Sequence, residues 1–187
     1  NHTTKSHRSS KKNFFNINKN LSIELIKSPG YKNNISLMRL IDHFILGVKL
    51  GFKLIFYKGN LPNCVFIGFP PIETAFILSI WLNHKKIAYV IDIKDKWPLL
   101  FYEPFRKSRF RIIVKLFLKP YTLLTHYIFR NATVVSSVSK SYLKWAYRYA
   151  NLQSAKKNIV LPLVGPKESF TNEEMNSIYN HPQVKAH

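Results

Sequence analysis

The sequence is poor in acidic residues, glycine and cysteine, and each scarcity narrows what the protein can be. In 187 residues, nine Asp and Glu stand against twenty-nine Lys and Arg, which gives a formal net charge of +20 at pH 7. Such a charge favours an anionic partner, namely nucleic acid, acidic lipid or a phosphorylated substrate. A coding bias toward Lys, Asn, Ile, Phe and Tyr explains the same excess without a partner, so both explanations stay open.

The sequence also lacks the familiar cofactor and metal motifs. Its six glycines form neither G-x-G-x-x-G nor G-x-x-x-x-G-K-[ST], so no common dinucleotide-binding or Walker loop is present. The seven histidines show no H-x-x-x-H or H-E-x-x-H spacing, which argues against a zinc site. There is no G-x-S-x-G nucleophile elbow either. We therefore expect no metal and no bound cofactor.

The one cysteine, Cys64, excludes an internal disulfide and fits a reducing compartment. It stands in an apolar run, so we predict a buried, unreactive thiol. No signal peptide and no run of about 18 uncharged apolar residues is present, so no membrane-spanning helix is expected. The first methionine is Met38 and the last residues are polar, which suggests a segment of a longer protein.

Alternating apolar periodicities predict strands that alternate with helices. The strands are expected at 21–27, 64–68, 87–93, 133–138 and 158–163, and the helices at 36–58, 72–84, 104–130 and 139–150. Ser36 and Ser139 suit helix N-caps, and Pro120 is expected to kink or split the third helix. Residues 1–20 are expected to form a loop. The alternation predicts an α/β fold with a Rossmann-like, doubly wound parallel sheet and helices on both faces.

The most informative segment is an acidic turn from Asp92 to Pro98, which follows an apolar strand-like run. In open α/β sheets, ligands bind outside the carboxyl ends of the strands. A carboxylate there, Asp92 or Asp95, can take a proton from a hydroxyl or orient it. Lys94 between them would keep both ionised and could hold a phosphate. A structural ion pair or a helix N-cap explains the same residues, so that alternative stays open.

Two further segments carry candidate site residues. After the preceding predicted strand, Pro70 and Pro71 fix a tight path, and Glu73 suits the first turn of a helix. This loop should lie beside the acidic turn, although a simple loop-to-helix entry explains it equally well.

The third predicted helix carries a basic stripe. Its members recur every four residues: Lys107, Arg111, Lys115 and Lys119. Apolar residues fall on the other side of the helix: Phe110, Ile113, Val114, Leu116 and Phe117. Such a helix can lie on an anionic membrane surface. An ordinary domain helix with a solvated charged face accounts for the same pattern.

In the order of its motifs, the sequence resembles family 4 glycosyltransferases of the GT-B fold, especially those that build bacterial O-antigens, capsules and related surface polysaccharides. The run from Pro70-Pro71-Ile72-Glu73 to the acidic turn is similar to the family's P-P-I-E followed by V-D-I-R-D-L-W-P. Further similar segments are Pro29 to Ser36 with Arg39 and His43, Asn131 to Val135, Val138 to Ala146, and Leu161 to Leu163.

The resemblance implies that residues 1–165 form a Rossmann-like acceptor-binding domain without its first strand and Gly-rich loop. Residues 166–187 would begin the crossover to an absent domain that binds the nucleotide-sugar. The full-length protein would be a hexosyltransferase that moves a sugar from a nucleotide-sugar donor to a polyprenyl-linked saccharide acceptor. It would need no metal and would lie in the cytoplasm, peripherally on the inner face of the cell membrane. No nucleic acid is expected as a partner.

With this resemblance, Asp95 is the first candidate for contact with the acceptor hydroxyl, and Asp92 either orients Asp95 or is a structural neighbour. The acceptor site would be shaped by Lys94, Pro70, Pro71, Glu73 and Trp97. The membrane surface would be met by Arg106, Lys107, Arg109, Arg111, Lys115 and Lys119. Lys94 replaces the family's usual Arg, which removes a planar bidentate fork.

The family's paired glutamates are missing, so the isolated segment is expected to be inactive. The rival interpretations are a non-enzymatic basic module that binds nucleic acid and an inactive, truncated half-enzyme.

Overall fold

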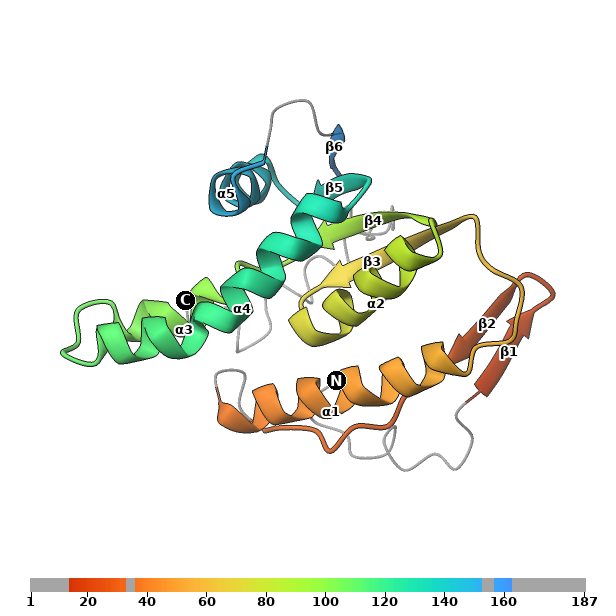
Figure 1. Ribbon diagram of the computed structural model, residues 1–187, viewed down its shortest axis with the longest axis horizontal. Helices are drawn as coiled ribbons and strands as arrows, with labels where there is room; N and C mark the ends of the chain where they lie inside the picture. Colours follow the sequence, from red (N-terminus) through yellow and green to blue (C-terminus); the bar gives the residue numbers. More distant parts are fainter. Residues whose placement is uncertain (1–13, 33–35, 153–156, 163–187) are drawn as a thin grey trace, which may run out of the picture.

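The computed structural model describes residues 14–32, 36–152 and 157–162. Its centre is a four-stranded, all-parallel sheet in the order β3-β4-β5-β6 (Figure 1). The strands are β3 (Cys64–Phe69), β4 (Ala88–Ile93), β5 (Val134–Ser137) and β6 (Lys157–Val160). Strands and helices alternate along the chain, so the predicted Rossmann-like α/β architecture is confirmed.

Two of the helices, those that follow Ser36 and Ser139, begin where the sequence predicts their N-caps. They are α1 (Leu37–Ile55), α2 (Ile72–His84), α3 (Leu99–Tyr102), α4 (Arg111–Asn131) and α5 (Lys140–Ala150), with a 3-10 turn η2 (Glu103–Phe105). The Ser36 hydroxyl accepts a hydrogen bond from the Arg39 N–H at 3.3 Å, and Ser139 accepts one from Tyr142 at 3.4 Å. Both serines are therefore the N-caps that the sequence predicts, and each satisfies an otherwise free N–H of the first turn.

One face of the sheet is packed under helices. Six of the residues that point to it are at most 4% exposed: Ile67, Phe69, Tyr89, Ile91, Ile93 and Val135. Phe129 of α4 packs edge-on against Phe69, and Trp145 of α5 packs against Phe129. The strand order advances in a single direction, so right-handed crossovers place α2, α4 and α5 in the same layer.

The opposite face is more open. Phe66 and Ile159 point to it and are 58% and 48% exposed. Within the described ranges, the long helices that connect consecutive parallel strands are α2, α4 and α5, all of the first layer; the short α3 and η2 precede α4. The predicted second layer of helices is therefore not seen in this part of the chain.

The N-terminal hairpin corrects the prediction for residues 14–27. β1 (Phe14–Asn18) and β2 (Leu21–Glu24) pair antiparallel in a sheet of their own, apart from the parallel sheet (Figure 1). Residues 14–18, part of the segment expected as a loop, thus form a strand, and residues 1–13 lie outside the described residues. The strand expected at 21–27 does not join the main sheet. Asn18 closes the turn by accepting the Asn20 N–H at 2.9 Å. All of β2 is exposed, and Glu24 of β2 forms an ion pair with Lys53 of α1.

The helix predicted at 104–130 is also corrected. Residues 99–105 form α3 and η2, a turn follows, and α4 begins only at Arg111. Lys107 therefore lies in the turn rather than on the helix. Pro120 does not split α4, although it offers no N–H to the carbonyl of Leu116.

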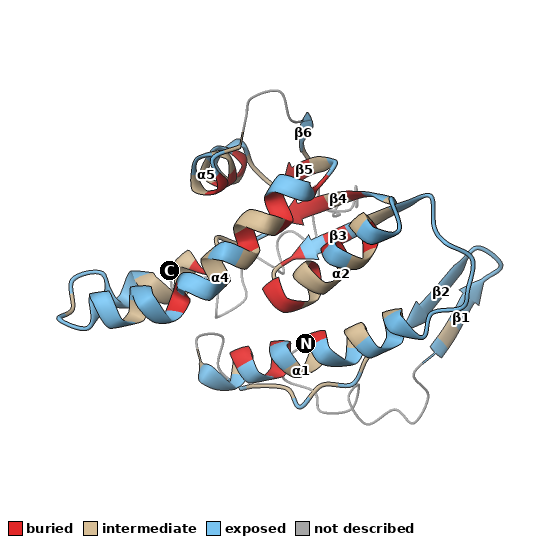
Figure 2. Cartoon of the chain, in the orientation of Figure 1, coloured by how far each residue is buried: buried red, intermediate tan, exposed pale blue. Residues whose placement is uncertain are grey.

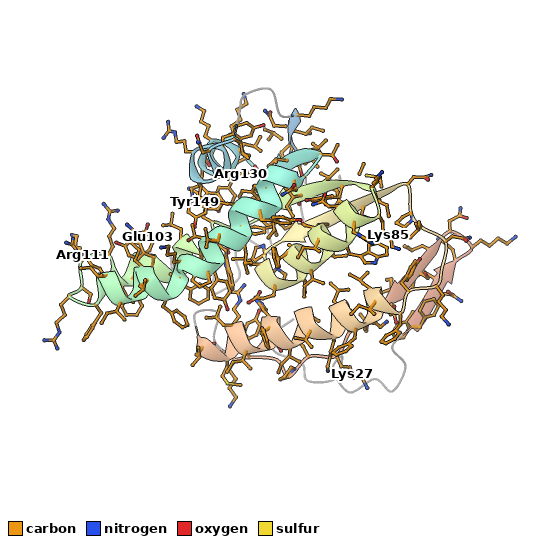
Figure 3. All side chains as sticks on the ribbon, in the orientation of Figure 1. Lys27, Lys85, Glu103, Arg111, Arg130 and Tyr149 are labelled. Atoms are coloured by element: carbon orange, nitrogen blue, oxygen red, sulfur yellow. The ribbon has the colours of Figure 1, made fainter. Side chains whose placement is uncertain are left out.

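α4 is long and apolar enough to cross a membrane by length and composition alone, the one such helix among the described residues. The sequence-based expectation of no spanning helix rested on a stricter criterion, a run of about 18 uncharged apolar residues, which α4 does not contain. Ile128 and Phe129 in its C-terminal half are fully buried in the domain core. Its N-terminal half extends beyond the other helices and is largely exposed (Figure 2), with Arg111 at the outer end (Figure 3). In this structure α4 is thus anchored as a helix of the domain.

Cys64 is exposed, which contradicts the prediction of a buried thiol. It is the first residue of β3, an edge strand whose outer side pairs with no described strand. Its side chain points to the same face of the sheet as Phe66, the open one. An apolar run of sequence buries every side chain of a strand only when both faces of the sheet are covered.

Candidate functional site

A row of polar and small residues crosses the carboxyl edge of the parallel sheet. The strand register aligns Gly68 of β3 with Asp92 of β4, and Asp92 with Ser136 of β5. Registered residues of parallel strands point to the same face, here the open one. The row therefore lies where open α/β sheets bind their ligands.

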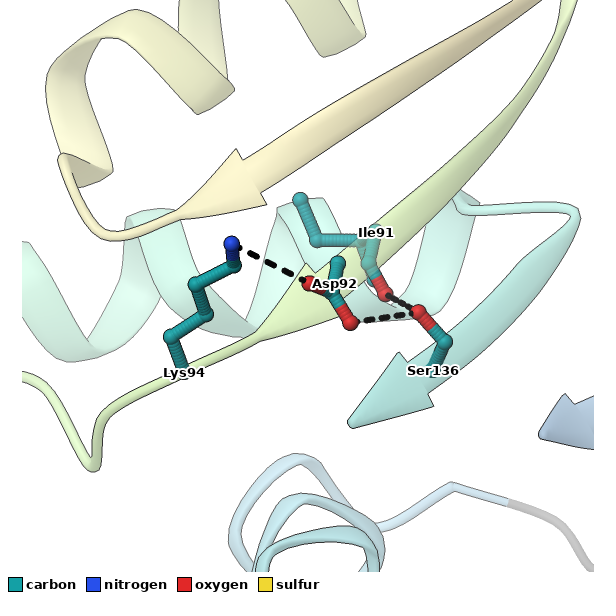
Figure 4. A network of polar contacts seen from close by, with 4 residues as sticks. All are labelled: Ile91, Asp92, Lys94 and Ser136. Atoms are coloured by element: carbon teal, nitrogen blue, oxygen red, sulfur yellow. Dashed lines mark hydrogen bonds and ion pairs between the residues drawn. The ribbon is translucent and has the colours of Figure 1, made fainter. Parts of the chain in front are cut away.

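Asp92 is held from two sides (Figure 4). The Ser136 hydroxyl donates to Asp92 Oδ1 at 2.8 Å, and Lys94 Nζ lies 3.8 Å from Asp92 Oδ2. Asp92 is 5% exposed, whereas the Lys94 side chain is 59% exposed. The buried carboxylate thus positions an ammonium group that remains open to an anion in solvent. The ion pair considered from the sequence is present, and it leaves Lys94 accessible.

Space is available beside this pair. A Cβ placed on Gly68 would meet no atom within 4 Å, so the neighbour of Asp92 in the row faces an open volume. The Lys94 N–H donates to the Phe69 carbonyl at 2.9 Å, which ties the ends of β3 and β4 together. Pro70 follows Phe69 directly and lies at this edge.

Asp95 lies in the same turn but makes a separate contact. Its Oδ1 accepts the Lys96 N–H at 3.0 Å, and the Lys96 ammonium lies 5.1 Å from the centre of the Tyr142 ring at the start of α5. Asp95 is partly exposed. The structure brings Asp92 and Lys94 into contact and places Asp95 beside them on the solvent side.

Glu73 and Trp97 belong to a different cluster, inside the helix layer. His43 Nδ1 of α1 lies 3.9 Å from Glu73 Oε2, and the His43 ring lies 5.1 Å from the Trp97 ring. The Arg39 guanidinium lies 4.4 Å from the centre of the Trp97 ring. Trp97 is fully buried and Glu73 is 7% exposed. Neither has a described contact with Asp92 or Asp95, although the sequence suggested one shared site.

Burial dominates the electrostatics of this cluster. It raises the pKa of Glu73 above its ordinary value. It lowers the pKa of His43 to about 4, with the charge of Arg39 as the second cause. His43 is therefore neutral at neutral pH.

Sequence reasoning missed two residues that the structure makes important. Ser136 holds Asp92, and Tyr121 of α4 faces Glu73. A serine pair at the end of an apolar strand was the available signal for Ser136. No local pattern pointed to Tyr121, because its partner lies on another helix.

The basic residues of the predicted membrane surface are all exposed. They are Arg106, Lys107 and Arg109 in the turn before α4, and Arg111, Lys115 and Lys119 on α4. Four apolar residues between them are exposed as well: Ile112, Ile113, Leu116 and Phe117 are 70%, 66%, 68% and 57% exposed, whereas Leu118 is 6% exposed. An ordinary domain helix would bury its apolar side in the core. This half of α4 presents that side to the surface.

Comparison with models of protein families, with curated proteins and with solved structures gives no match. Among the residues that the structure describes, no group of three or more His, Cys, Asp or Glu could hold a metal ion. The function must therefore be inferred from the geometry of the site.

Proposed function

We propose that this domain is the acceptor-side half of a family 4 glycosyltransferase of the GT-B fold, in which a second layer of helices completes a doubly wound sheet. The observation that carries the proposal is the Ser136–Asp92–Lys94 network at the carboxyl edge of an all-parallel sheet, beside the open space at Gly68. The motif order of the sequence supports the same assignment.

Each charged group then has a part in binding the acceptor. Asp95, which is partly exposed, accepts or orients the proton of the attacking hydroxyl. Asp92 is engaged by Ser136 and Lys94, so it acts as a positioning residue. The Lys94 ammonium meets a phosphate of the lipid-linked acceptor, where a point charge suffices.

The exposed half of α4 supports a lipid-linked acceptor. Its apolar side and the neighbouring basic residues are both at the surface, as expected of a helix that lies in an anionic membrane interface. The protein would work peripherally on the inner face of the cell membrane. Its donor would be a nucleotide-sugar bound by a second domain, and its product a surface polysaccharide precursor.

The substitution Asp95→Asn tests this proposal in the full-length protein that carries this sequence. We expect turnover to fall by a factor on the order of 10² or more, because proton transfer by a positioned carboxylate contributes about that much. Turnover is measured as transfer of radiolabel from a panel of UDP- and GDP-sugars to polyprenyl-diphosphate saccharides in membranes.

Glu103→Gln is the matched control, since it removes an exposed carboxylate near α3 and should leave turnover unchanged. Wild-type turnover in Asp95→Asn would remove Asp95 from the mechanism. Absence of transfer from every donor by the wild-type protein would count against the assignment itself.

A further inference from the structure

A groove lies between α1, α2 and α4, in the helix layer and away from the Asp92 row. We call it the α1–α4 groove; its lining is Phe44, Val48, Glu73, Phe76, Ile77, Pro120, Tyr121 and Leu124. Its volume is about 400 Å³, and small-molecule sites typically span roughly 300–1,000 Å³. The lining is apolar apart from Glu73 and the Tyr121 hydroxyl.

Glu73 is the buried polar group of this groove. It is 7% exposed, and its carboxylate oxygens make no hydrogen bond of normal geometry among the described residues, although the Tyr121 hydroxyl lies close enough to offset part of the rise that burial causes in the pKa of Glu73. The rim is open by contrast, because Phe44 is 62% and Val48 39% exposed. A ligand that brings a hydrogen-bond donor or a positive charge to this buried carboxyl group would stabilise it.

The groups that face Glu73 do not neutralise it. On α1, His43 lies at 3.9 Å, and its pKa is lowered to about 4 by burial and by Arg39. The Arg39 guanidinium lies over the rings of Trp97 and Tyr31. On α4, burial and then the Glu73 charge raise the pKa of Tyr121 to about 12, so Tyr121 is an uncharged phenol. Glu73 is therefore the acidic group of the groove lining; burial raises its pKa, and an ammonium bound beside it favours the ionised carboxylate.

Three aromatic rings share the lining with that carboxylate: Phe44, Phe76 and Tyr121. Aromatic faces attract cations, and the attraction grows when the site is desolvated. A carboxylate beside such rings supplies the counter-charge. We infer that the α1–α4 groove binds an organic ammonium cation with an apolar substituent, with the ammonium at Glu73 and the apolar part along Val48, Ile77 and Leu124. This site does not depend on glycosyl transfer.

Isothermal titration of the full chain with hexylammonium chloride, and with hexanol as its uncharged counterpart, tests the inference. We expect saturable binding of hexylammonium and at least about tenfold weaker binding of hexanol. Glu73→Gln keeps the size of the side chain and should weaken hexylammonium binding at least about tenfold. Glu103→Gln, an exposed carboxylate outside the groove, should change nothing. Equal affinity for both ligands, or unchanged affinity in Glu73→Gln, would overturn the inference.

A second variant keeps the test decisive if Glu73→Gln does not fold. Phe76→Leu retains the carboxylate and removes one ring, and it should weaken hexylammonium binding several-fold while leaving hexanol binding unchanged. An equal loss for both ligands would overturn the role of the ring.

The natural cation could come from a free amine or from a lipid headgroup. Dihexanoylphosphatidylethanolamine and dihexanoylphosphatidylglycerol, both below their micelle concentrations, distinguish the two sources. If the ethanolamine lipid binds and Glu73→Gln weakens that binding, the natural cation is a lipid headgroup. If hexylammonium binds and the ethanolamine lipid does not, the natural cation is a free amine. Equal binding of the glycerol lipid, which has no ammonium, would overturn the inference.

Discussion

The 2.8 Å hydrogen bond from Ser136 to Asp92 joins two strands whose chain positions are 44 residues apart. Ser136 is fully buried and Asp92 nearly so, and the exposed Lys94 supplies the remaining contact. The position of the Asp92 carboxylate thus depends on one buried donor, the Ser136 hydroxyl. The Lys94 ammonium is held in turn by its ion pair with that carboxylate.

Ser136→Ala should therefore destabilise the fold by about 1–3 kcal/mol, since a buried acceptor loses its partner. Urea unfolding followed by circular dichroism measures the change in the free energy of unfolding. Ser22→Ala, at an exposed position of the hairpin, should lie within about 0.5 kcal/mol of wild type. A Ser136→Ala protein as stable as this control would show that the hydrogen bond contributes nothing net.

His43 gives the protein a defined pH dependence. Its pKa falls from 6.5 in the unfolded chain to about 4 in the folded one. The unfolded state thus binds more protons between these values, and stability is lost as the pH falls through this window. The loss is on the order of 3 kcal/mol when complete. The raised pKa of Glu73 acts in the opposite direction, so it offsets part of the loss.

His43→Gln isolates the histidine contribution, since it removes that titration and leaves Glu73 in place. Urea unfolding at a series of pH values between about 4 and 7 should show a shallower acid-side loss in the variant. Parallel pH profiles for the two proteins would contradict the buried, neutral state of His43.

Two helices, α1 and α4, carry the surface features discussed above: α1 packs closely on α2, and α4 leaves one half exposed. A Cβ on Gly47 of α1 would come within 3.0 Å of Glu73 Cβ, so the missing side chain lets α1 and α2 cross closely. That crossing places His43 beside Glu73. α4 is anchored by Ile128 and Phe129 at one end and leaves its other end uncovered. One end of α4 thus packs in the core, and its other end is free for the membrane contact that we propose.

Leu116→Gln tests the exposed half of α4. Leu116 is 68% exposed, so the folded state should change by no more than about 0.5 kcal/mol. Binding to vesicles that contain phosphatidylglycerol should weaken by about tenfold or more, since burying a leucine in lipid is worth about 1.5–3 kcal/mol. Vesicle co-sedimentation measures this. Leu61→Gln, in an exposed loop, should have no effect, and equal effects of both changes would exclude a specific role for α4.

At the scale of the whole molecule, the net charge of +20 is spread over many elements, whereas exposed apolar side chains gather on α1 and on the outer half of α4. Charge alone attracts nucleic acid and acidic lipid alike. Apolar burial adds to binding only at the lipid. The two partners should therefore differ in their response to salt.

Binding of the full chain to arbitrary duplex DNA should fall by roughly 10³–10⁵ between about 50 and 200 mM salt, as expected for contacts with phosphates alone. Binding to anionic vesicles should fall much less, because its apolar part is not screened. Fluorescence anisotropy and vesicle co-sedimentation compare the two. Salt-dependent DNA binding that is still tighter than the binding to anionic vesicles at the higher salt concentration would favour the basic nucleic-acid module instead.

Some parts of the fold were predictable because their signals are local. α2 has the predicted bounds, and both serine caps act as predicted, since helix spacing and capping are read within a few residues. The hairpin was not predictable in the same way. A strand pattern does not say which partner the strand will find. The turn before α4 was missed because residues 106–110 contain no glycine or proline that would mark a break in the helix.

The sequence by itself determined the alternating strands and helices and the placing of Asp92, Lys94 and Asp95 at the end of β4. These follow from periodicity and from the geometry of parallel sheets. Only the tertiary structure decided that Ser136 holds Asp92, that Glu73 and Trp97 join His43 in the helix layer, and that the apolar side of α4 stays exposed. Each of these depends on which residues meet across long stretches of chain, and packing settles that.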